Sequence, residues 1–283
     1  MMQHPTAVVV AYGALELLEQ CLPSLAGLRV IVVDNSSSPS ARAVSEVHGA
    51  KYIDPGGNLG FAAAVNIALA CLDCSAPTDV LLLNPDAVLA RGAAASLTAF
   101  LRQPGNERVA AVSPRLVDSN GCEQRVEWPF PSPARAWLEA FGLGRLSPGS
   151  GSFLVGAALL LRAEALRDIG GFDERFFLYA EETDWQRRAA RRKWEVRMLP
   201  DVTVEHSGGG TSADPKRREA LFHAGQETYI RKWYGPVGWS VYRCAQIFAG
   251  VTRAVLLRGE RRRVRWRAAI LYVRGPRRVA GFT

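Results

Sequence analysis

The chain has 283 residues, of which 48 % are hydrophobic and 22 % charged. This balance excludes an intrinsically disordered protein and allows one large α/β domain with a small appendage. The formal net charge of +8 is unevenly placed, with basic residues concentrated near the end of the sequence. We find no signal-peptide pattern and no apolar run of the roughly 20 residues that cross a bilayer, so we expect a cytoplasmic protein.

Five cysteines are scattered along the sequence, and their odd number argues against a disulfide framework. Cys71 and Cys74 form a C-x-x-C, but they stand in an apolar helical run without a second Cys or His pair nearby. We interpret them as reduced thiols buried in a helix, as in a cytosolic protein, and not as a zinc or redox site.

Short apolar strands alternate with helical segments through the first hundred residues. Strands are expected at residues 7–11, 29–37, 51–53 and 79–84. Helices are expected at residues 14–25, 41–48, 61–72 and 91–102, with the loop GGNLG before the third of them. This alternation predicts an α/β fold in which a mainly parallel sheet carries helices on its faces.

The pattern changes after residue 107. Shorter pieces are expected at 108–127, with Ser119-Asn120-Gly121 as a hairpin turn, and 128–151 has no clear period and reads as a mobile segment over a site. Later elements are expected as a strand at 153–161, helices at 163–169 and 182–192, strands at 195–199 and 202–206, and helices over 216–233 and most of the tail. We therefore predict one domain over 1–214 and a helical, basic segment over 215–283.

The tail from Arg253 to Arg278 combines arginines with apolar and aromatic residues, and Glu260 is its single acid. Such a mixture favours a surface that lies on an anionic membrane, which would place the protein at the inner face of the cell membrane. A solvated tail without a partner and a nucleic-acid contact are the alternatives. Of the three we favour the membrane and expect no nucleic-acid partner.

Polar side chains follow the early strands at their carboxyl ends, where open parallel sheets bind ligands. Tyr12 follows the first strand, and Asp34 ends the second, where it could accept hydrogen bonds from a base or ribose or cap a turn. Asn84-Pro85-Asp86 follows the strand at 79–84. Asp86 together with a diphosphate could hold a hard divalent cation, although the same tripeptide also suits an ordinary β-turn.

Three acids, Glu181, Glu182 and Asp184, begin the helix expected at 182–192. The helix dipole favours acids in a first turn, which accounts for the charge alone. Burying one of several close carboxylates raises its pKa and makes it a usable general base. Asp184 is spaced to pair with Arg187 or Arg188, whereas Glu182 has no obvious local partner.

His206 ends the apolar strand VTVEH and precedes the glycine run 208–210. An imidazole in this place could supply a nitrogen ligand to a metal ion, or it could have a structural role. The glycines provide the backbone freedom for a loop that closes over phosphate.

Taken together and in this order, these motifs resemble the inverting glycosyltransferases of family 2, particularly the bacterial rhamnosyltransferase-like branch. The resemblance runs from about Ala7 to about Thr211 and rests on VVVAYG, VIVVDNSS, GGNLGFAAAVN, LLLNPDA, LVGAALLLRAEALRDIGGFDERFFLYAEETDW and VEHSGGGTS. It implies the GT-A fold, a Rossmann-like, mixed and mainly parallel sheet flanked by helices, with a C-terminal helical appendage.

The resemblance also implies the residues of a metal site and a base. The D-x-D metal motif of the family falls on Asn84-Pro85-Asp86; because Asn takes the first position, Asp86 is the expected ligand. The late metal-binding histidine falls on His206. The catalytic acidic pair falls on Glu181-Glu182, and its second member, usually Asp in the family, is the expected base, here Glu182.

Further positions follow from the same resemblance. Residues expected to bind the nucleotide sugar are Tyr12, Asp34, Asn58, Gly60, Asn84 and Asp86. Gly60 is expected to allow a close backbone approach, and Asn66 to hold its loop. Residues expected to bind the acceptor or to support the site are Glu181, Asp184 and Trp185.

The resemblance implies transfer of a sugar, with rhamnose the first candidate, from a nucleotide-diphosphate sugar to a hydroxyl of a cell-surface glycan or polyprenyl-linked precursor. The expected cofactor is Mg²⁺ or Mn²⁺. A nucleotidyltransferase is one alternative, but Tyr12-Gly13-Ala14 after the first strand lacks the basic phosphate loop that such an enzyme usually needs. A non-catalytic basic protein that binds membrane or nucleic acid is another, and it leaves Asp86, Glu182 and His206 unexplained.

Overall fold

The computed structural model describes residues 4–73, 78–146, 151–208 and 214–282. Cys74 and two members of the glycine run, Gly209 and Gly210, lie outside the described residues. Two compact units divide the chain. The first comprises Met1–Trp128, Ser152–Phe177 and Glu181–Ala213, and the second Pro129–Gly151, Leu178–Ala180 and Asp214–Thr283. The predicted division of domains between residues 214 and 215 stays a prediction.

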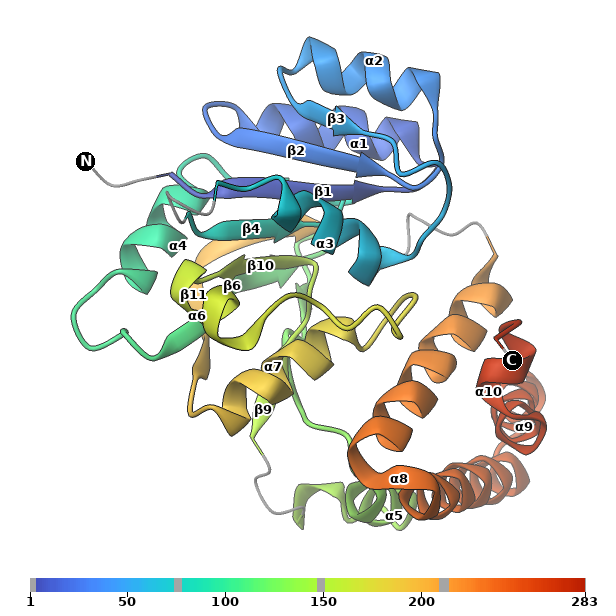
Figure 1. Ribbon diagram of the computed structural model, residues 1–283. Helices are drawn as coiled ribbons and strands as arrows, with labels where there is room; N and C mark the ends of the chain where they lie inside the picture. Colours follow the sequence, from blue (N-terminus) through green and yellow to red (C-terminus); the bar gives the residue numbers. More distant parts are fainter. Residues whose placement is uncertain (1–3, 74–77, 147–150, 209–213, 283) are drawn as a thin grey trace. The chain divides into compact units, whose positions relative to one another are not determined.

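A mixed sheet forms the centre of the first unit (Figure 1). Within the described residues it has nine strands, in the order β3-β2-β1-β4-β10-β6-β11-β5, with β7 beside β6, while β8 and β9 pair separately. The strands are β1 (Thr6–Ala11), β2 (Arg29–Asp34), β3 (Lys51–Ile53), β4 (Val80–Leu83), β5 (Ala87–Leu89), β6 (Val109–Val117), β7 (Glu123–Gln124), β8 (Glu127–Pro129), β9 (Ser152–Leu154), β10 (Ala158–Leu161) and β11 (Glu195–His206).

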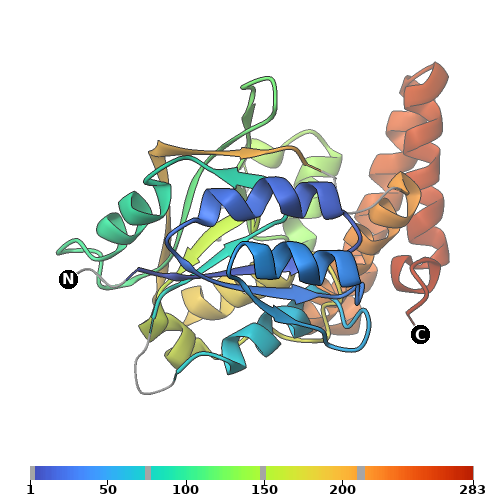
Figure 2. The ribbon, with the colours of Figure 1, turned by 90° about the horizontal axis from the view of Figure 1, so that it is seen from above.

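Helices cover both faces of this sheet, and the two views agree that α1 and α3 lie on opposite faces (Figures 1 and 2). The helical elements of this unit are α1 (Leu15–Cys21), the 3₁₀ turn η1 (Leu22–Leu25), α2 (Pro39–Val47), α3 (Phe61–Ala70), α4 (Ala93–Leu101), α6 (Ala163–Ile169) and α7 (Glu181–Arg191). Cover on both faces explains why β1, β4 and β10 are buried at every position and read as continuous apolar runs. The predicted α/β architecture, a mixed sheet flanked by helices, is confirmed.

The register of the sheet aligns the carboxyl ends of its first strands. β1 runs parallel to β2 and β4, with Ala11 opposite Asp34 and Val9 opposite Leu83. β10 runs antiparallel to β4, and β11 runs antiparallel to β5 with His206 opposite Ala87. The segments that follow β1, β2 and β4 therefore leave the same edge of the sheet.

Several predicted elements differ in detail from the structure. The strand predicted at 153–161 is two strands, β9 and β10, interrupted around Gly156. The two strands predicted at 195–199 and 202–206 are one, β11, with a register shift between Leu199 and Thr203. The predicted hairpin turn at Ser119-Asn120-Gly121 joins β6 to β7, which pair antiparallel.

The segment 128–151, predicted to lack regular structure, contains the helix α5 (Pro133–Ala140) and the turn η2 (Gly144–Leu146). The Ser132 side chain accepts a hydrogen bond from the backbone N–H of Arg135, at 3.1 Å, and Pro133 opens the helix. The same Ser-Pro start, Ser38-Pro39, begins α2. A polar N-cap followed by Pro is a helix start signal, and the Pro- and Gly-rich composition around it masks the signal here.

The second unit is helical. Its main elements are α5, η2, α8 (Pro215–Leu256), α9 (Gly259–Arg274) and α10 (Pro276–Val279). α8 is kinked where Gly235 takes a φ of 68° before Pro236. Figure 2 shows α9 running alongside the later part of α8. Among the described residues, no helix combines the length and apolarity that crossing a membrane requires.

Residues 178–180 belong to this helical unit and carry unusual backbone conformations. Tyr179 and Ala180 have φ of 68° and 69°, a left-handed conformation that side chains with a Cβ rarely adopt. Gly225 of α8 lies against them: a Cβ built there would lie 2.4 Å from the carbonyl oxygen of Tyr179. The Tyr179 ring also meets Phe222 edge to face at 5.8 Å. Contacts with α8 thus hold these two residues in place.

Gly60 precedes α3, and its backbone closely approaches that of Phe177. It has a φ of 87°, and a Cβ built there would lie 2.4 Å from the carbonyl oxygen of Phe177. The same carbonyl accepts a hydrogen bond from the N–H of Phe61, at 2.7 Å. The space that glycine leaves open is therefore taken by Phe177, which fastens the segment after α6 to the start of α3.

We predict that Gly60→Ala lowers the free energy of unfolding by roughly 2–4 kcal/mol, because the Cβ adds overlap with Phe177 to backbone strain. Gly56→Ala is the matched control: Gly56 has a φ of 81° with nothing near its Cβ position, so strain alone should cost roughly 1–2 kcal/mol. Urea unfolding of both variants measures the difference. Equal losses would contradict the role given to Phe177.

Candidate active site

The turn after β4 presents Asp86 beside the end of β11. The N–H of Ala87 donates to the carbonyl of Asn84 at 3.0 Å, so Asn84-Pro85-Asp86-Ala87 is a hydrogen-bonded β-turn with Pro in its second position. The N–H of Ser207 donates to the carbonyl of Asp86, also at 3.0 Å. The β-turn interpretation is therefore correct, and the turn brings the Asp86 side chain to His206.

The two side chains predicted to bind the metal meet directly. The His206 Nε2 atom lies 3.4 Å from Oδ1 of Asp86, and both side chains are largely buried. On the other side of the ring, the His206 Nδ1 atom lies 2.8 Å from Oε1 of Gln124 in β7. Gln124 Nε2 donates to the backbone carbonyl of His206 at 2.8 Å.

These contacts determine how the imidazole is protonated. A backbone carbonyl only accepts hydrogen bonds, so the nitrogen of the Gln124 amide must face it and the Gln124 oxygen must face Nδ1. Nδ1 therefore carries a proton. In the neutral ring, Nε2 then turns its lone pair toward the carboxylate of Asp86, and two acceptors face each other.

A divalent cation fits this pair of donors. Carboxylate oxygen and imidazole nitrogen are common ligands, and a ligating histidine usually donates its other N–H to a fixed acceptor, as His206 does to Gln124. Within the described residues, no group of three or more His, Cys, Asp or Glu side chains gathers as a metal site. The protein thus offers two donors, and phosphate oxygens of a substrate could complete the coordination.

Cys21 contacts the turn after β4 but does not act as a metal ligand. Its thiol donates a weak hydrogen bond to the Asn84 carbonyl, with sulfur and oxygen 3.8 Å apart. Burial, and the charge of Asp86 after it, raise the pKa of the Cys21 thiol to about 12. A thiol that stays protonated packs and donates but does not bind a metal ion.

Glu182, the predicted base, is joined to the same turn through the break between β9 and β10. The N–H of Asn84 donates to the carbonyl of Ala157 at 2.9 Å. The preceding residue, Gly156, lies next to Glu182: a Cβ built there would come within 3.4 Å of Glu182 Cγ. One step of chain, Gly156-Ala157, therefore separates the Glu182 side chain from the turn that carries Asp86.

One turn further along α7, the side chain of Gln186 joins α7 to β9. Its side-chain oxygen accepts from the N–H of Leu154, and its side-chain nitrogen donates to the carbonyl of Leu154, both at 2.7 Å. Gln186 is buried, as is most of the face that α7 turns toward the sheet. The half-buried Glu182 at the start of α7 is thereby held over Gly156.

Glu181, the neighbour of Glu182, has an environment of its own. It is buried, and its Oε2 atom has no hydrogen-bond partner among the described residues. Burial, and then the charge of Glu182, raise the pKa of Glu181 well above its ordinary value. The two adjacent carboxyl groups therefore differ in environment, and Glu181 keeps its proton to a higher pH than a carboxyl group in water does.

Asp184 and Trp185 lie inside the protein, which favours the supporting one of their two predicted roles. Asp184 is fully buried and pairs with Arg188 at 3.1 Å, one of the two partners predicted for it. The Trp185 ring is also fully buried, stacks on Phe172 and donates from Nε1 to the Gly170 carbonyl at 2.9 Å. Neither side chain presents a surface to an acceptor.

Asp34 is fully buried and surrounded by donors of its own turn. One oxygen accepts from the N–H and the hydroxyl of Ser36, at 2.9 and 2.5 Å; the other accepts from the Ser38 N–H and the Tyr52 hydroxyl, at 2.8 and 3.0 Å. Burial, followed by the hydrogen bond to Asp34, raises the pKa of Tyr52 to about 12, so this hydroxyl remains a donor. Four bonds use the acceptor capacity of the carboxylate, which acts here as a turn cap. Its contact with a nucleotide stays a prediction.

The residue after it, Asn35, holds the loop that was predicted to bind nucleotide. Asn35 donates to the carbonyl of Gly60 at 3.1 Å and accepts from the Leu59 N–H at 3.4 Å. Asn58 in this loop is exposed, and its side-chain oxygen accepts from the Gly60 N–H at 3.0 Å. Tyr12 is exposed at the carboxyl end of β1. Tyr12 and Asn58 thus remain accessible to a ligand, and Gly60 shapes the loop.

Asn66 was predicted to hold the GGNLG loop, but it binds elsewhere. Its side chain exchanges two hydrogen bonds with the backbone of Phe172, both at 2.8 Å, and donates to Glu174 at 2.8 Å. This interaction anchors the segment after α6 to α3.

Sequence reasoning missed Gln124, Gln186 and Asn35 as side chains that build the site. Asn35 stood within a recognised motif, so its position was a usable signal. Gln124 lies 82 residues from His206, in a two-residue strand with no pattern of its own. Its role follows only from the pairing of β7 with β6 and of β6 with β11.

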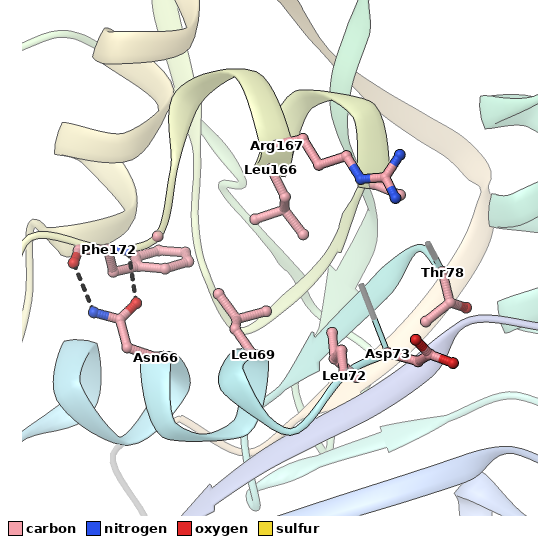
Figure 3. Close-up of a pocket in the computed structure, with 10 residues that line it drawn as sticks. Asn66, Leu69, Leu72, Asp73, Thr78, Leu166, Arg167 and Phe172 are labelled. Atoms are coloured by element: carbon pink, nitrogen blue, oxygen red, sulfur yellow. Dashed lines mark hydrogen bonds between the residues drawn. The ribbon is translucent and has the colours of Figure 1, made fainter. Parts of the chain in front are cut away.

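A cavity of about 460 Å³ lies apart from the residues of the candidate active site (Figure 3). Apolar side chains such as Leu69, Leu72 and Leu166 line it, with Asp73 and Arg167 among the polar ones. None of the residues predicted to bind the nucleotide sugar or the metal lines it. The candidate active site is therefore defined by its side chains and not by this cavity.

Known proteins resemble this chain in sequence. The N-acetylglucosaminyl-diphospho-decaprenol L-rhamnosyltransferase of Mycobacterium tuberculosis is 29 % identical, over 90 % of this chain and 95 % of that protein. The low-salt glycan biosynthesis hexosyltransferase of Haloferax volcanii is 26 % identical, over 73 % of this chain and 68 % of that protein.

Solved structures resemble it in fold. S. aureus TarS, residues 1–349, superposes with a TM-score of 0.52 at 14 % identity and covers 99 % of this chain and 90 % of its own. Glucosyl-3-phosphoglycerate synthase from Mycobacterium tuberculosis, in complex with Mn²⁺, UDP and glucosyl-3-phosphoglycerate, superposes with a TM-score of 0.53 at 16 % identity, over 81 % of this chain and 80 % of its own. At these identities the likeness shows the shared fold, GT-A, which confirms the predicted fold class.

The family model described as glycosyl transferase family group 2 matches residues 80–273, more than half of the chain. A match of this extent sets aside the nucleotidyltransferase and the non-catalytic binding protein that the sequence left as alternatives. The chain therefore belongs to the family 2 glycosyltransferases and is a glycosyltransferase.

Proposed function

We propose that the protein is an inverting glycosyltransferase, dependent on Mg²⁺ or Mn²⁺, that moves rhamnose from a nucleotide-diphosphate sugar to a hydroxyl of a polyprenyl-linked glycan precursor. The observation that carries the proposal is the pair Asp86 and His206, whose imidazole Gln124 orients, joined through Gly156-Ala157 to Glu182. The proposal therefore assigns the nucleotide-sugar donor, the metal ion and the base to one end of the sheet.

Asp86 and His206 are the residues that would hold the cation. A bound divalent cation would supply positive charge to the diphosphate, which becomes more negative as it leaves the sugar. Asp86 is held by its turn and by Ser207, and His206 is held by Gln124. Both metal-binding side chains are therefore in place before a substrate arrives. Around them, Tyr12, Asn58 and Asn84 are the proposed contacts to the nucleotide and its sugar, with Asp34 and Gly60 shaping the turn and loop that present them.

Glu182 is the proposed base. It accepts the proton of the acceptor hydroxyl as the oxygen bonds to the anomeric carbon and the bond from that carbon to the diphosphate breaks. A direct displacement forms no covalent sugar-enzyme intermediate, so one base is enough and the configuration inverts. Glu181, which tends to keep its proton, and the buried Asp184 and Trp185 support the start of α7.

The substrates are proposed from relatives. The Mycobacterium tuberculosis relative is named for transfer of L-rhamnose to N-acetylglucosaminyl-diphospho-decaprenol, and the similarity spans nearly the whole of both chains. The structural neighbour glucosyl-3-phosphoglycerate synthase holds Mn²⁺ and UDP. We therefore propose deoxythymidine-diphosphate-rhamnose as donor, a lipid-linked sugar as acceptor, and attachment of the protein to the periphery of the membrane through the basic segment 215–283.

A nucleotide-sugar panel with purified protein and Mg²⁺ tests the function. We expect release of nucleoside diphosphate, fastest from the rhamnose donor, and an inverted linkage in the product. Glu182→Gln should lower kcat by about 10²-fold or more while leaving donor affinity unchanged, because only the base is lost. Turnover of Glu182→Gln like that of the unmodified protein would remove Glu182 from this role.

Glu181→Gln is the matched control, and it also predicts a pH effect. Burial raises the pKa of Glu181 above its unfolded value, so this group contributes stability below the unfolded pKa and loses it as the pH rises through the folded pKa. A glutamine mimics the protonated form at every pH. We expect Glu181→Gln to keep most of its turnover and to become more stable relative to the unmodified protein as the pH rises above about 4.5. Urea unfolding at a series of pH values measures this, and a variant that is less stable at high pH would contradict the assignment.

Metal binding is tested without turnover. Titration of Mn²⁺ into the protein with a nucleoside diphosphate should give binding that Asp86→Asn abolishes. Gln124→Ala should weaken it by about 10- to 100-fold, because the imidazole loses the contact that orients it. Glu123→Ala, an exposed neighbour in the same hairpin, is the control and should bind normally. Unchanged Mn²⁺ affinity in Asp86→Asn would refute the metal site.

A further inference from the structure

The helical unit exposes large apolar side chains on neighbouring elements near the turn between α8 and α9. Val255 and Leu256, at the end of α8, are 71 % and 82 % exposed. Phe141 after α5 and Leu146 in η2 are 60 % and 70 % exposed. Side chains of this kind are normally covered, and their exposure together marks an interaction surface.

Packing within the unit brings these elements together. The Phe248 ring of α8 lies 5.6 Å from the ring of Trp137 and 5.4 Å from that of Phe141. Arg253 of α8 donates to the carbonyl of Glu139 in α5 at 2.8 Å. The last turns of α8 are therefore fastened to the end of α5.

α9 packs on the other face of the same part of α8. Gly250 lies two residues from Phe248 and so faces the opposite way, and a Cβ built there would lie 2.9 Å from the Cβ of Ala269. Arg243 donates to the carbonyls of Tyr272 and Val273, at 2.7 and 2.6 Å. The end of α8 is thus flanked by α5 and α9, and we call the exposed end of this assembly, residues 141–146 and 253–267, the tip surface.

Arginines accompany the apolar side chains of the tip surface. Those that are exposed in α9 and the turn before it are Arg258, Arg261, Arg262, Arg263, Arg265 and Arg267. Arg145 adds one from η2, and Glu260 is the single acid between residues 253 and 267. Trp266 and Val264 are partly exposed among them. The surface is therefore strongly basic and apolar at once.

The later part of the basic tail is anchored to the helical unit along one side. Ala269 and Tyr272 are buried, and the N–H of Arg277 donates to the carboxylate of Glu227 at 3.1 Å. The hydroxyl of Tyr272 lies 2.9 Å from Nδ1 of the half-buried His223. Ile270, Val273 and Arg274 stay exposed on the other side of α9. The tip surface is therefore defined by the concentration of arginines in the first half of the tail 253–278, together with residues 141–146 from outside that tail.

We propose that the tip surface lies on a bilayer with anionic headgroups, with Val255, Leu256, Phe141 and Leu146 entering the interface and the arginines pairing with lipid phosphates. This rests on the membrane attachment in the proposed function and names the surface that performs it. Arginine side chains let charged ends reach phosphates while their stems lie on apolar groups. Apolar insertion and headgroup attraction together are the usual basis of binding at a membrane interface.

Two other occupants fit less well. A second copy of the chain, docked through the same surface about a two-fold axis, would bring arginines against arginines with only Glu260 of each copy to offset them. A nucleic acid would pair with the arginines but would leave Val255 and Leu256 in water, since backbone contacts dominate such binding. The anionic bilayer satisfies both kinds of side chain.

Sedimentation with vesicles tests the proposal independently of sugar, metal or turnover. The full chain should bind vesicles of equal parts phosphatidylglycerol and phosphatidylcholine, bind pure phosphatidylcholine weakly, and release at raised salt. Arg261→Ser with Arg263→Ser should lower the affinity by roughly 30-fold. Val255→Ser with Leu256→Ser should lower it by about tenfold or more.

Matched controls separate the surface from overall charge and apolarity. Arg29→Ser with Arg91→Ser removes the same charge from exposed positions of the first unit, and Val237→Ser removes an exposed valine at the other end of the straight part of α8. Both should bind like the unmodified protein, and thermal melts should show all variants folded. Equal loss in controls and tip variants would overturn the proposal.

Three further results would also overturn it. These are an absence of vesicle binding, a tip-dependent shift of single-stranded RNA in its place, and a tip-dependent dimer in sedimentation velocity without lipid binding. A protein that binds anionic vesicles through its tip but releases no nucleoside diphosphate from any donor would leave this inference standing and refute the proposed function.

Discussion

The amide of Gln124 controls the chemistry proposed for the end of the sheet. By donating to the backbone carbonyl of His206 it can only accept from the ring, and the imidazole must then direct its second nitrogen at Asp86. That orientation depends on β6, which pairs with β7 on one side and with β11 on the other. The pairing of these strands therefore determines which ring nitrogen of His206 carries the proton and which one faces Asp86.

The strands show what pattern alone can predict. β4 is apolar at every position and β1 at every position after Thr6, so their places, and the polar residues at their ends, follow directly from the sequence. Asp86 was predicted in this way, whereas Glu182 was predicted from the acids at the start of α7; the roles of both stay predictions. The pairing of Asp184 with Arg188 also followed, because partners four residues apart on a helix are set by its geometry.

Other features depend on contacts between distant residues, and sequence patterns do not record them. Asp34 looks like a ligand group at a strand end, yet Ser36, Ser38 and Tyr52 surround it with donors, and Tyr52 comes from a neighbouring strand. Gly60 looks like a glycine that admits a ligand, yet the chain itself occupies the space, through Phe177. These contacts could not be read from the sequence, because the type of a side chain tells what it can bind and only the fold decides which partner it meets; the roles of Asp34 and Gly60 toward a nucleotide stay predictions.

Tyr179 and Ala180, which both have left-handed backbone conformations, make the start of α7 dependent on the helical segment that follows in the chain. Both residues depend on α8, where Gly225 leaves room for the Tyr179 carbonyl, and the very next peptide begins α7 with Glu181 and Glu182. A protein ending before α8 would keep the whole sheet and every polar residue at its edge. It would nonetheless release this pair to relax into ordinary conformations, and the first turn of α7 would lose its fixed entry. The proposed base, Glu182, would in this sense need the helical segment, whatever else that segment binds.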